Sequence, residues 1–276
     1  MPISAAHKSR LLDDIHWGRL IVGFCLTAVL SLSVHTVMID VLHVPYPSQE
    51  VKALLPFRLI TNLAVAFGAV WLYGALRKDL PRRGWALPAI ILFLLMCGLN
   101  ETLRGWLMNA YCNAPFLESA LFLGLVTLAG TLYYASTAAL VALGWRYMRT
   151  DGQKVLGLLA IVLLLTLVIS PLAALAREET ATHFKYLSPL NGWCIMPYGP
   201  NILIPAYATF IEPALACMIC VAFCWNYLPG GFWTKVLAFT LLIMALKQQL
   251  FAAFLYAFYA KLLEWTAPER HQNVPE

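Results

Sequence analysis

Seven apolar stretches, each about as long as a membrane-spanning helix, constrain this chain more than any other feature. A span needs about 20 largely apolar residues, because the hydrocarbon core is about 30 Å thick and an α-helix rises 1.5 Å per residue. The stretches predict an all-α, polytopic integral membrane protein with a single bundle of seven transmembrane helices. Their approximate ranges are 17–42, 57–76, 85–109, 119–145, 155–176, 202–228 and 236–263.

The composition excludes an ordinary soluble domain. Of the 276 residues, 61% are hydrophobic and only 12% are charged, whereas soluble domains average roughly a quarter charged residues. The net charge of +5 comes from short basic clusters between the apolar stretches and not from one broad basic face. We therefore expect membrane lipids as the surroundings and no nucleic-acid partner.

Basic residues concentrate in every second connection between the predicted spans. They are Lys8, Arg10 and Arg19 at the first span, Arg77, Lys78, Arg82 and Arg83 after the second, Arg146, Arg149 and Lys154 after the fourth, and Lys235 before the seventh. Basic connections favour the cytoplasmic side, so the N-terminal segment 1–16 is predicted inside and the tail 266–276 outside. A bacterial inner membrane is the expected location.

The longest outer connection, residues 177–201, is rich in proline, glycine and aromatic residues. This composition predicts an ordered cap of turns. The cap contains Cys194, and the outer connection after the third span contains Cys112. Because these are the two cysteines predicted outside, a disulfide between them is expected if that compartment is oxidising.

Charged residues inside the spans indicate where function resides, because an isolated charge in hydrocarbon costs roughly 2.5–3.5 kcal/mol and needs a partner or a polar cavity. The third span is the richest, with Gly105 leaving a gap on the helix face that Glu101 shares with Asn109. Polar groups on the first two spans lie at a similar predicted depth. The predicted ligand cavity, open to the outside, is lined by His35, Arg58, Asn62, Asn100, Glu101, Arg104 and Asn109.

Two further charges are predicted to meet near the middle of the membrane. Glu212 enters from outside on the sixth span and Lys247 enters from inside on the seventh, at roughly equal depth. Adjacent antiparallel helices would then place these opposite charges together as a buried ion pair. This pair acts either as a structural lock or as a gating or coupling element.

The fragment Asn-Glu-Thr-Leu-Arg-Gly at residues 100–105 resembles in outline the Glu-Glu-x-x-x-Arg-Gly helix of the CAAX-type glutamic intramembrane proteases. One acid of that motif is missing here, the spacing from acid to arginine is one residue shorter, and no later span carries the histidines of that family. No activity or catalytic residue is transferred from this likeness.

Three classes of function stay open from the residues alone. The first is a transporter or permease that admits a small, anionic solute or lipid headgroup to the polar cavity. The second is an intramembrane enzyme acting on a lipid or lipid-linked substrate, with Glu101 or His35 as general base and Arg104 as anion clamp. The third is a non-catalytic membrane subunit that binds a protein partner or a second copy of itself. No dinucleotide fingerprint, P-loop or zinc-ligand spacing is present, so neither cofactor nor metal is expected.

Overall fold

The structure is a computed structural model that describes residues 55–80, 84–194 and 199–250, together with the isolated positions 18, 21, 22, 25 and 29. The chain divides into two compact units, Met1–Val44 and Pro45–Glu276. The isolated positions in the first unit are helical. His35, most of the predicted first span, the N-terminal segment 1–16 and the tail 266–276 lie outside the described residues.

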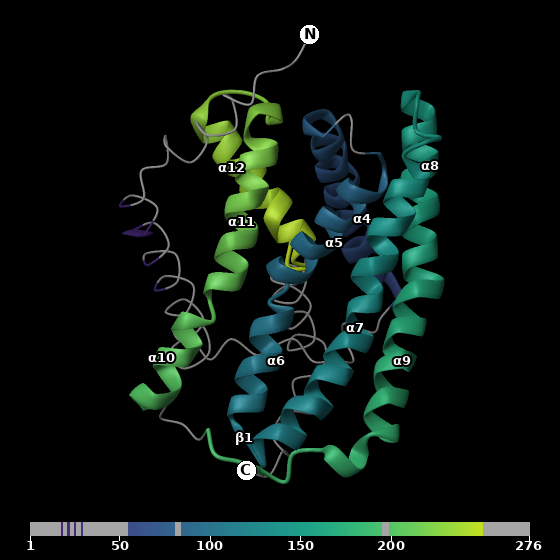
Figure 1. Cartoon of the computed structure of the whole chain (residues 1–276). Helices are drawn as coiled ribbons and strands as arrows, with labels where there is room; N and C mark the ends of the chain where they lie inside the picture. Colours follow the sequence, from purple (N-terminus) through teal and green to yellow (C-terminus); the bar gives the residue numbers. More distant parts are fainter. Residues whose placement is uncertain are drawn as a thin grey trace, which may run out of the picture. The chain divides into compact units, whose positions relative to one another are not determined.

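The described part of the second unit is almost entirely helical (Figure 1). Short strands β1 (Asn113–Ala114) and β2 (Asn191–Gly192) form one antiparallel pair. The helices in chain order are α4 (Leu55–Asp79), α5 (Ala86–Leu99), α6 (Thr102–Tyr111), α7 (Phe116–Gly144), α8 (Asp151–Leu164), the π-helix η2 (Leu165–Ile169), α9 (Ser170–His183), the 3₁₀-helix η3 (Lys185–Leu187), α10 (Pro200–Ala208), α11 (Ile211–Cys224), the 3₁₀-helix η4 (Trp225–Tyr227) and α12 (Phe232–Leu246).

Four helical segments in the described part are long and apolar enough to cross a membrane. They are Leu55–Asp79, Phe116–Gly144, Asp151–His183 and Pro200–Tyr227. A fifth candidate consists of α5 and α6, which are bent by 42° at a short break. The all-α, membrane-type character of the chain is therefore confirmed. Seven spans and the orientation of the two termini stay predictions.

Two predicted boundaries differ from the structure. Helix α9 continues to His183, so the first residues of the predicted cap 177–201 are helical and the irregular connection is shorter. Helix α12 ends at Leu246 and not near residue 263, because Lys247 and the left-handed Gln248 (φ 59°) end the helical ladder. Neither end is marked by a glycine or proline at the break, which is the usual sequence signal.

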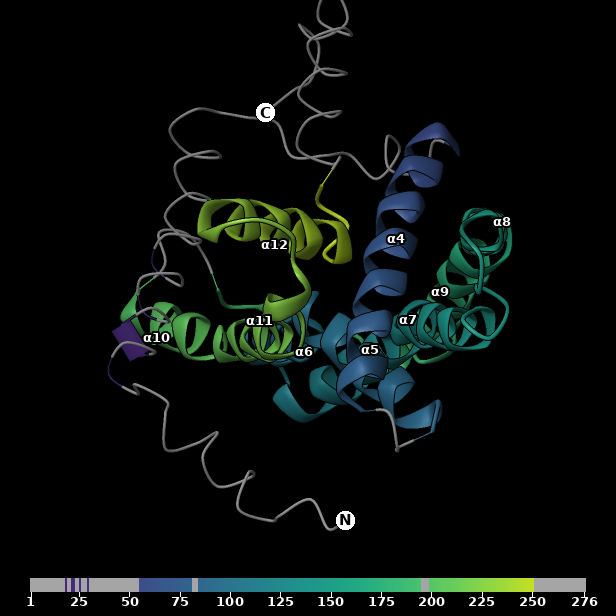
Figure 2. The ribbon, with the colours of Figure 1, turned by 90° about the horizontal axis from the view of Figure 1, so that it is seen from above.

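Helix α4 is the centre of the unit and packs against helices on several sides (Figure 2). It buries eleven residues, many of them alanine or glycine. Small side chains let neighbouring helices approach closely, which is the main source of helix association where hydrocarbon replaces water. Large buried side chains complete the core; among them are Leu72, Tyr73, Leu92, Met96, Val141, Leu165 and Leu246.

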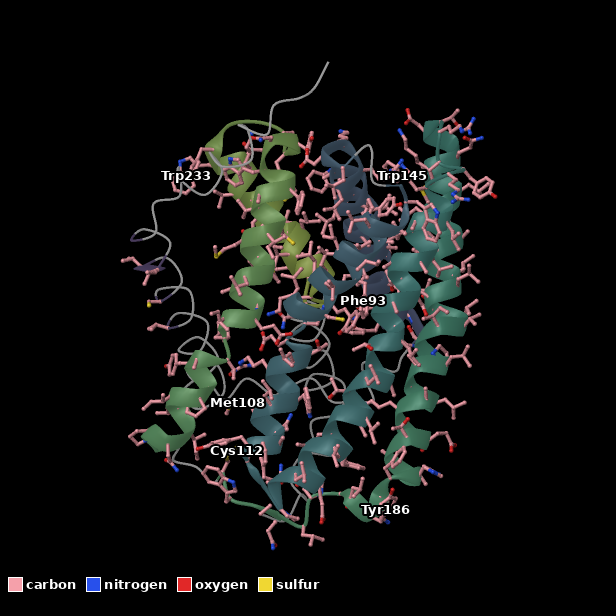
Figure 3. All side chains as sticks on the ribbon, viewed as in Figure 1. Phe93, Met108, Cys112, Trp145, Tyr186 and Trp233 are labelled. Carbon is pink, nitrogen blue, oxygen red and sulfur yellow. A yellow bond between two sulfur atoms is a disulfide. The ribbon has the colours of Figure 1, made fainter. Side chains whose placement is uncertain are left out.

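The basic connections lie at one end of the unit. Arg146 stacks over the ring of Trp85, with 5.4 Å from the guanidinium carbon to the ring centroid. Arg77 donates a hydrogen bond to the backbone carbonyl of Gly84, in the connection between α4 and α5. Trp145 and Trp233 lie at this end, whereas Cys112 and Tyr186 lie at the opposite end (Figure 3). The clustering agrees with the alternation of basic connections in the sequence.

The opposite end is closed by a covalent link. Cys112 and Cys194 form a disulfide with a Cα–Cα distance of 5.1 Å, which confirms the predicted bridge. Beside it, Asn113 pairs with Gly192 and Ala114 pairs with Asn191 in the β1–β2 ladder. The link joins the end of α6 to the connection that leads to α10.

We expect Gly98→Leu to destabilise the protein, because a Cβ at Gly98 would lie 3.0 Å from the Cβ of Ala216 on α11. Overpacking of this kind costs about 1–3 kcal/mol. Gly105→Leu is the matched control, since a Cβ there meets nothing within 4 Å, and a helical leucine is favoured over glycine. Chemical denaturation of the full chain in detergent micelles measures both. Equal stability of the two variants would contradict the close α5–α11 contact.

Candidate functional site

Two helical spans are interrupted and a third helix ends at the same level of the unit. Helix α5 gives way to α6 at Asn100 and Glu101, α10 gives way to α11 at Thr209 and Phe210, and α12 ends before Lys247. Each interruption leaves backbone groups without a partner in their own helix. In a membrane those groups need partners from elsewhere in the protein. The side chains that supply the partners form the candidate site.

Asn100 joins two of these helix ends. Its Nδ2 donates to the carbonyl of Met96 in its own helix at 2.8 Å and to the carbonyl of Leu246 at the end of α12 at 3.0 Å. One amide thereby satisfies the last turns of two separate helices. This contact places the end of α12 directly beside the α5–α6 break (Figure 1).

Glu101 lies in the left-handed backbone region, with φ 56° and ψ 38°. A non-glycine residue in this conformation costs of order 1–3 kcal/mol, and such strain gathers at functional sites. The conformation aims the carboxylate at two cations. Arg104 Nη1 donates to Oε2, and Lys247 Nζ donates to Oε1 at 2.8 Å. All three side chains are about one-fifth exposed.

Glu212 caps a helix that is distant in sequence. Its two carboxylate oxygens accept hydrogen bonds from the backbone N–H groups of Leu103 at 3.0 Å and Arg104 at 2.5 Å. These N–H groups belong to the first turn of α6, where backbone donors lack partners and the helix dipole is positive. A carboxylate is the group that such a position favours most.

The predicted Glu212–Lys247 pair is therefore wrong. Lys247 pairs with Glu101, and Glu212 binds the start of α6. Sequence reasoning placed both residues at one depth, and both do reach the α5–α6 break. The left-handed turn at Glu101 brings its carboxylate to Lys247, and that turn decides the pairing. The ion pairs are also partly exposed and not buried.

We call Glu101, Arg104, Glu212 and Lys247 the charged cluster. Its formal charge is zero, from two carboxylates and two cations. The two carboxylates have different partners. Glu212 accepts hydrogen bonds from backbone N–H groups, whereas Glu101 pairs with both cations. Arg104 Nε is buried and has no hydrogen-bond partner within the part of the chain that the structure describes. The cluster thus retains one cationic donor without a hydrogen-bond partner among the described residues.

Phe210 covers the arginine and was not identified from the sequence. The guanidinium carbon of Arg104 lies 5.1 Å from the centroid of the Phe210 ring. Arginine over an aromatic face is a favourable cation–π arrangement. No sequence signal marks this phenylalanine, because the chain has fourteen of them and its role depends on the break before α11.

Asn62 belongs to a separate polar network. Its Oδ1 accepts from the hydroxyl of Tyr133 at 2.6 Å, and its Nδ2 donates to Thr166 at 3.0 Å and to Ser170 at 3.4 Å. This network joins α4, α7 and the junction of η2 with α9. Asn62 is 4% exposed and its amide is satisfied by these helices. No hydrogen bond among the described residues connects Asn62 to the charged cluster.

The other predicted cavity residues lie in different settings. Arg58 is one helical turn from Asn62, and its Nε has no partner in the described ranges. Asn109 is exposed and donates to the carbonyl of Gly105 in its own helix at 2.7 Å. A single cavity that joins Arg58 and Asn62 to Glu101 and Arg104 stays a prediction.

One open groove of the described unit lies between α6 and α7. It has a volume of about 390 Å³ and is lined by Thr102, Leu103, Trp106, Ala120, Leu121, Gly124, Leu125, Thr127, Leu128 and Thr131. Its lining is mostly apolar and includes none of the predicted ligand residues. Among the described residues, no group of three or more His, Cys, Asp or Glu side chains could hold a metal ion.

No known protein family, curated protein or solved structure matches this chain. Its function is therefore inferred from its own residues and their geometry.

We expect Glu101 and Lys247 to be energetically coupled. In a double-mutant cycle of Glu101→Gln and Lys247→Met, contacting charges should show a coupling free energy of about 0.5–3 kcal/mol for unfolding. The parallel cycle of Glu212→Gln with Lys247→Met serves as the control and should give a smaller value, since these residues share no direct contact. A larger coupling for Glu212 would restore the pair expected from the sequence.

We also expect Asn62→Leu to lower stability without affecting ligand binding. The leucine leaves the buried hydroxyl of Tyr133 without its acceptor, and an unsatisfied buried polar group costs about 1–3 kcal/mol. The thermal midpoint of the full chain in detergent measures the loss. If Asn62→Leu instead left the stability of the ligand-free protein unchanged but abolished its stabilisation by a bound anion, Asn62 would belong to the ligand site.

Proposed function

We propose that this chain is a membrane transport protein that binds a small anionic solute at the charged cluster. The observation that carries the proposal is the position of Arg104 and Lys247. Two cations share one carboxylate at the point where two helical spans are interrupted and α12 ends. Interrupted membrane helices with charges at the break are typical of substrate and coupling-ion sites in secondary transporters.

The chemistry of the cluster favours a carboxylate or a phosphate. Arginine presents a planar fork of donors that matches these groups, and lysine adds a mobile point charge. Glu212 already occupies the N-terminal donors of α6 with a carboxylate. It shows which chemical group the start of α6 accepts. A solute carboxylate or phosphate could use the unpaired Nε of Arg104 beside it.

Access from the outside is part of the proposal. The disulfide lies at the end of the unit to which α6 leads, and disulfides persist in oxidising compartments. We therefore propose that this end faces the outside of a bacterial inner membrane. The basic connections at the other end agree with this orientation under the positive-inside rule.

The geometry of Glu101 argues against this residue as the general base of an enzyme, whereas His35, the other candidate, lies outside the described residues. Both oxygens of the Glu101 carboxylate accept hydrogen bonds from cations, so it is poorly placed to take a proton from a substrate. The purely structural alternative is represented by the Asn62 network, whose polar groups are mutually satisfied. The charged cluster differs from that network in retaining an unpaired cationic donor.

Ligand-induced stabilisation tests the proposal. The purified full chain is heated with inorganic phosphate, acetate, lactate or succinate in separate samples. An anion that binds the folded state at 100 times its Kd adds about 2.7 kcal/mol to the free energy of unfolding. At least one of these anions should raise the thermal midpoint by several degrees, and Arg104→Gln should abolish that rise. Arg177→Gln, on the exposed face of α9, is the matched control and should behave as the unmodified chain.

The same anion, radiolabelled, should accumulate in proteoliposomes that contain the protein and not in those with Arg104→Gln. The proposal fails if none of the four anions shifts the midpoint, or if Arg104→Gln responds as the control does. It also fails if the anion binds but is never taken up.

A further inference from the structure

We infer that α10 is a hinged half-span that opens and closes over Arg104, and that the Cys112–Cys194 disulfide tethers its far end to α6. The inference rests on the proposed function, because a gate has a purpose only for a site that a solute enters. Three features that do not depend on that function support the gate: the packing of α10, the link at Thr209 and Phe210, and the contacts at the disulfide end.

Helix α10 is loosely packed, unlike the helix that continues its span. Helix α10 buries only Ile202, whereas Ile204 is 68% exposed, and α10 makes only sparse contacts with the other described helices. Helix α11 packs closely on α5 and α4, with Cys220 and Cys224 fully buried. Segments with few buried apolar contacts move at low free-energy cost. The span Pro200–Tyr227 therefore combines a mobile half with a fixed half.

The junction between the halves is suited to bending. Thr209 and Phe210 are non-helical residues between α10 and α11 (Figure 1). Pro213, four residues after Thr209, has no N–H to donate to the carbonyl of Thr209, which instead accepts from the N–H of Glu212 at 3.3 Å. A junction with a thinned hydrogen-bond ladder absorbs dihedral changes more easily than a continuous helix.

Movement at this junction acts directly on the charged cluster. Phe210, 8% exposed, covers the guanidinium of Arg104. Two residues later, Glu212 holds the first turn of α6. A swing of α10 about the junction displaces the Phe210 ring while α11 keeps Glu212 in place. The unpaired Nε of Arg104 would then become accessible.

The far end of α10 is tied to α6 by noncovalent contacts as well as by the disulfide. Pro205 has no N–H, so the carbonyl of Asn201 one turn earlier loses its helical partner. The hydroxyl of Tyr111, the last residue of α6, donates to this carbonyl at 2.9 Å. The Tyr111 ring also packs edge-to-face on Trp193, next to Cys194, with centroids 4.9 Å apart. These contacts limit how far α10 can travel.

Distance measurements by pulsed electron resonance test the gate without any solute. Spin labels are attached through p-acetylphenylalanine, which avoids the native cysteines. One pair joins Ile204 on α10 to Ile219 on α11, and the control pair joins Leu94 on α5 to Ile219. The full chain is measured in lipid nanodiscs as the oxidised protein, after reduction of the disulfide, and as the Tyr111→Phe variant.

Reduction of the disulfide, or Tyr111→Phe, should at least double the width of the Ile204–Ile219 distance distribution or add a second distance. The Leu94–Ile219 distance distribution should stay unchanged. Reduction of the unmodified chain provides the result even if Tyr111→Phe folds poorly. The inference is overturned if the α10 pair stays as narrow as the control pair, or if both pairs broaden together. A moving α10 without anion uptake would refute the proposed function alone, and uptake with an immobile α10 would refute the gate alone.

Discussion

Every backbone N–H and C=O group inside a membrane needs a hydrogen-bond partner within the protein, and this requirement organises the described unit. A continuous helix supplies these partners from its own backbone. Where α5 and α12 end and α6 begins, side chains supply these partners. Asn100 serves the ends of α5 and α12, and Glu212 serves the start of α6. The polar residues at the breaks are therefore needed for the fold as well as for any ligand.

The left-handed turn at Glu101 connects this requirement to the charges. The turn is strained, and it persists because its surroundings hold it on several sides. Glu212 fixes the first turn of α6 after it, and Asn100 fixes the last turn of α5 before it. Lys247 and Arg104 hold the carboxylate itself. The same contacts that stabilise the break leave Arg104 Nε without a hydrogen-bond partner among the described residues, next to an aromatic ring. The proposed preference for anions rests on this arrangement.

The two polar networks of the unit offset the free-energy cost of burying polar groups in different ways. Around Asn62, hydroxyl and amide groups satisfy one another between three helices, and the result resembles the polar packing contacts common between membrane helices. Around Glu101, full charges are only partly withdrawn from solvent. Partial exposure lowers the desolvation cost of these charges. The second network, and not the first, is the candidate site.

The sequence alone determined the features that depend on composition along a single helix. Apolar length identified the spans that α4, α7, α8 with α9, and α10 with α11 form, because hydrocarbon thickness sets a minimum length. The alternation of basic residues identified the end at which Arg77 and Arg146 lie. The position of Cys112 and Cys194 on one side was enough to expect their disulfide.

Only the tertiary structure decided where the helices break and which charges meet. No glycine or proline stands at Asn100 and Glu101, and the break exists because partners more than a hundred residues away satisfy its backbone and carboxylate. Depth along a span correctly brought Glu212 and Lys247 to one level, but depth does not specify which helix faces which. The left-handed turn at Glu101 places its carboxylate next to Lys247, and Glu212 binds the start of α6 instead. Such a turn depends on contacts that a linear pattern does not contain.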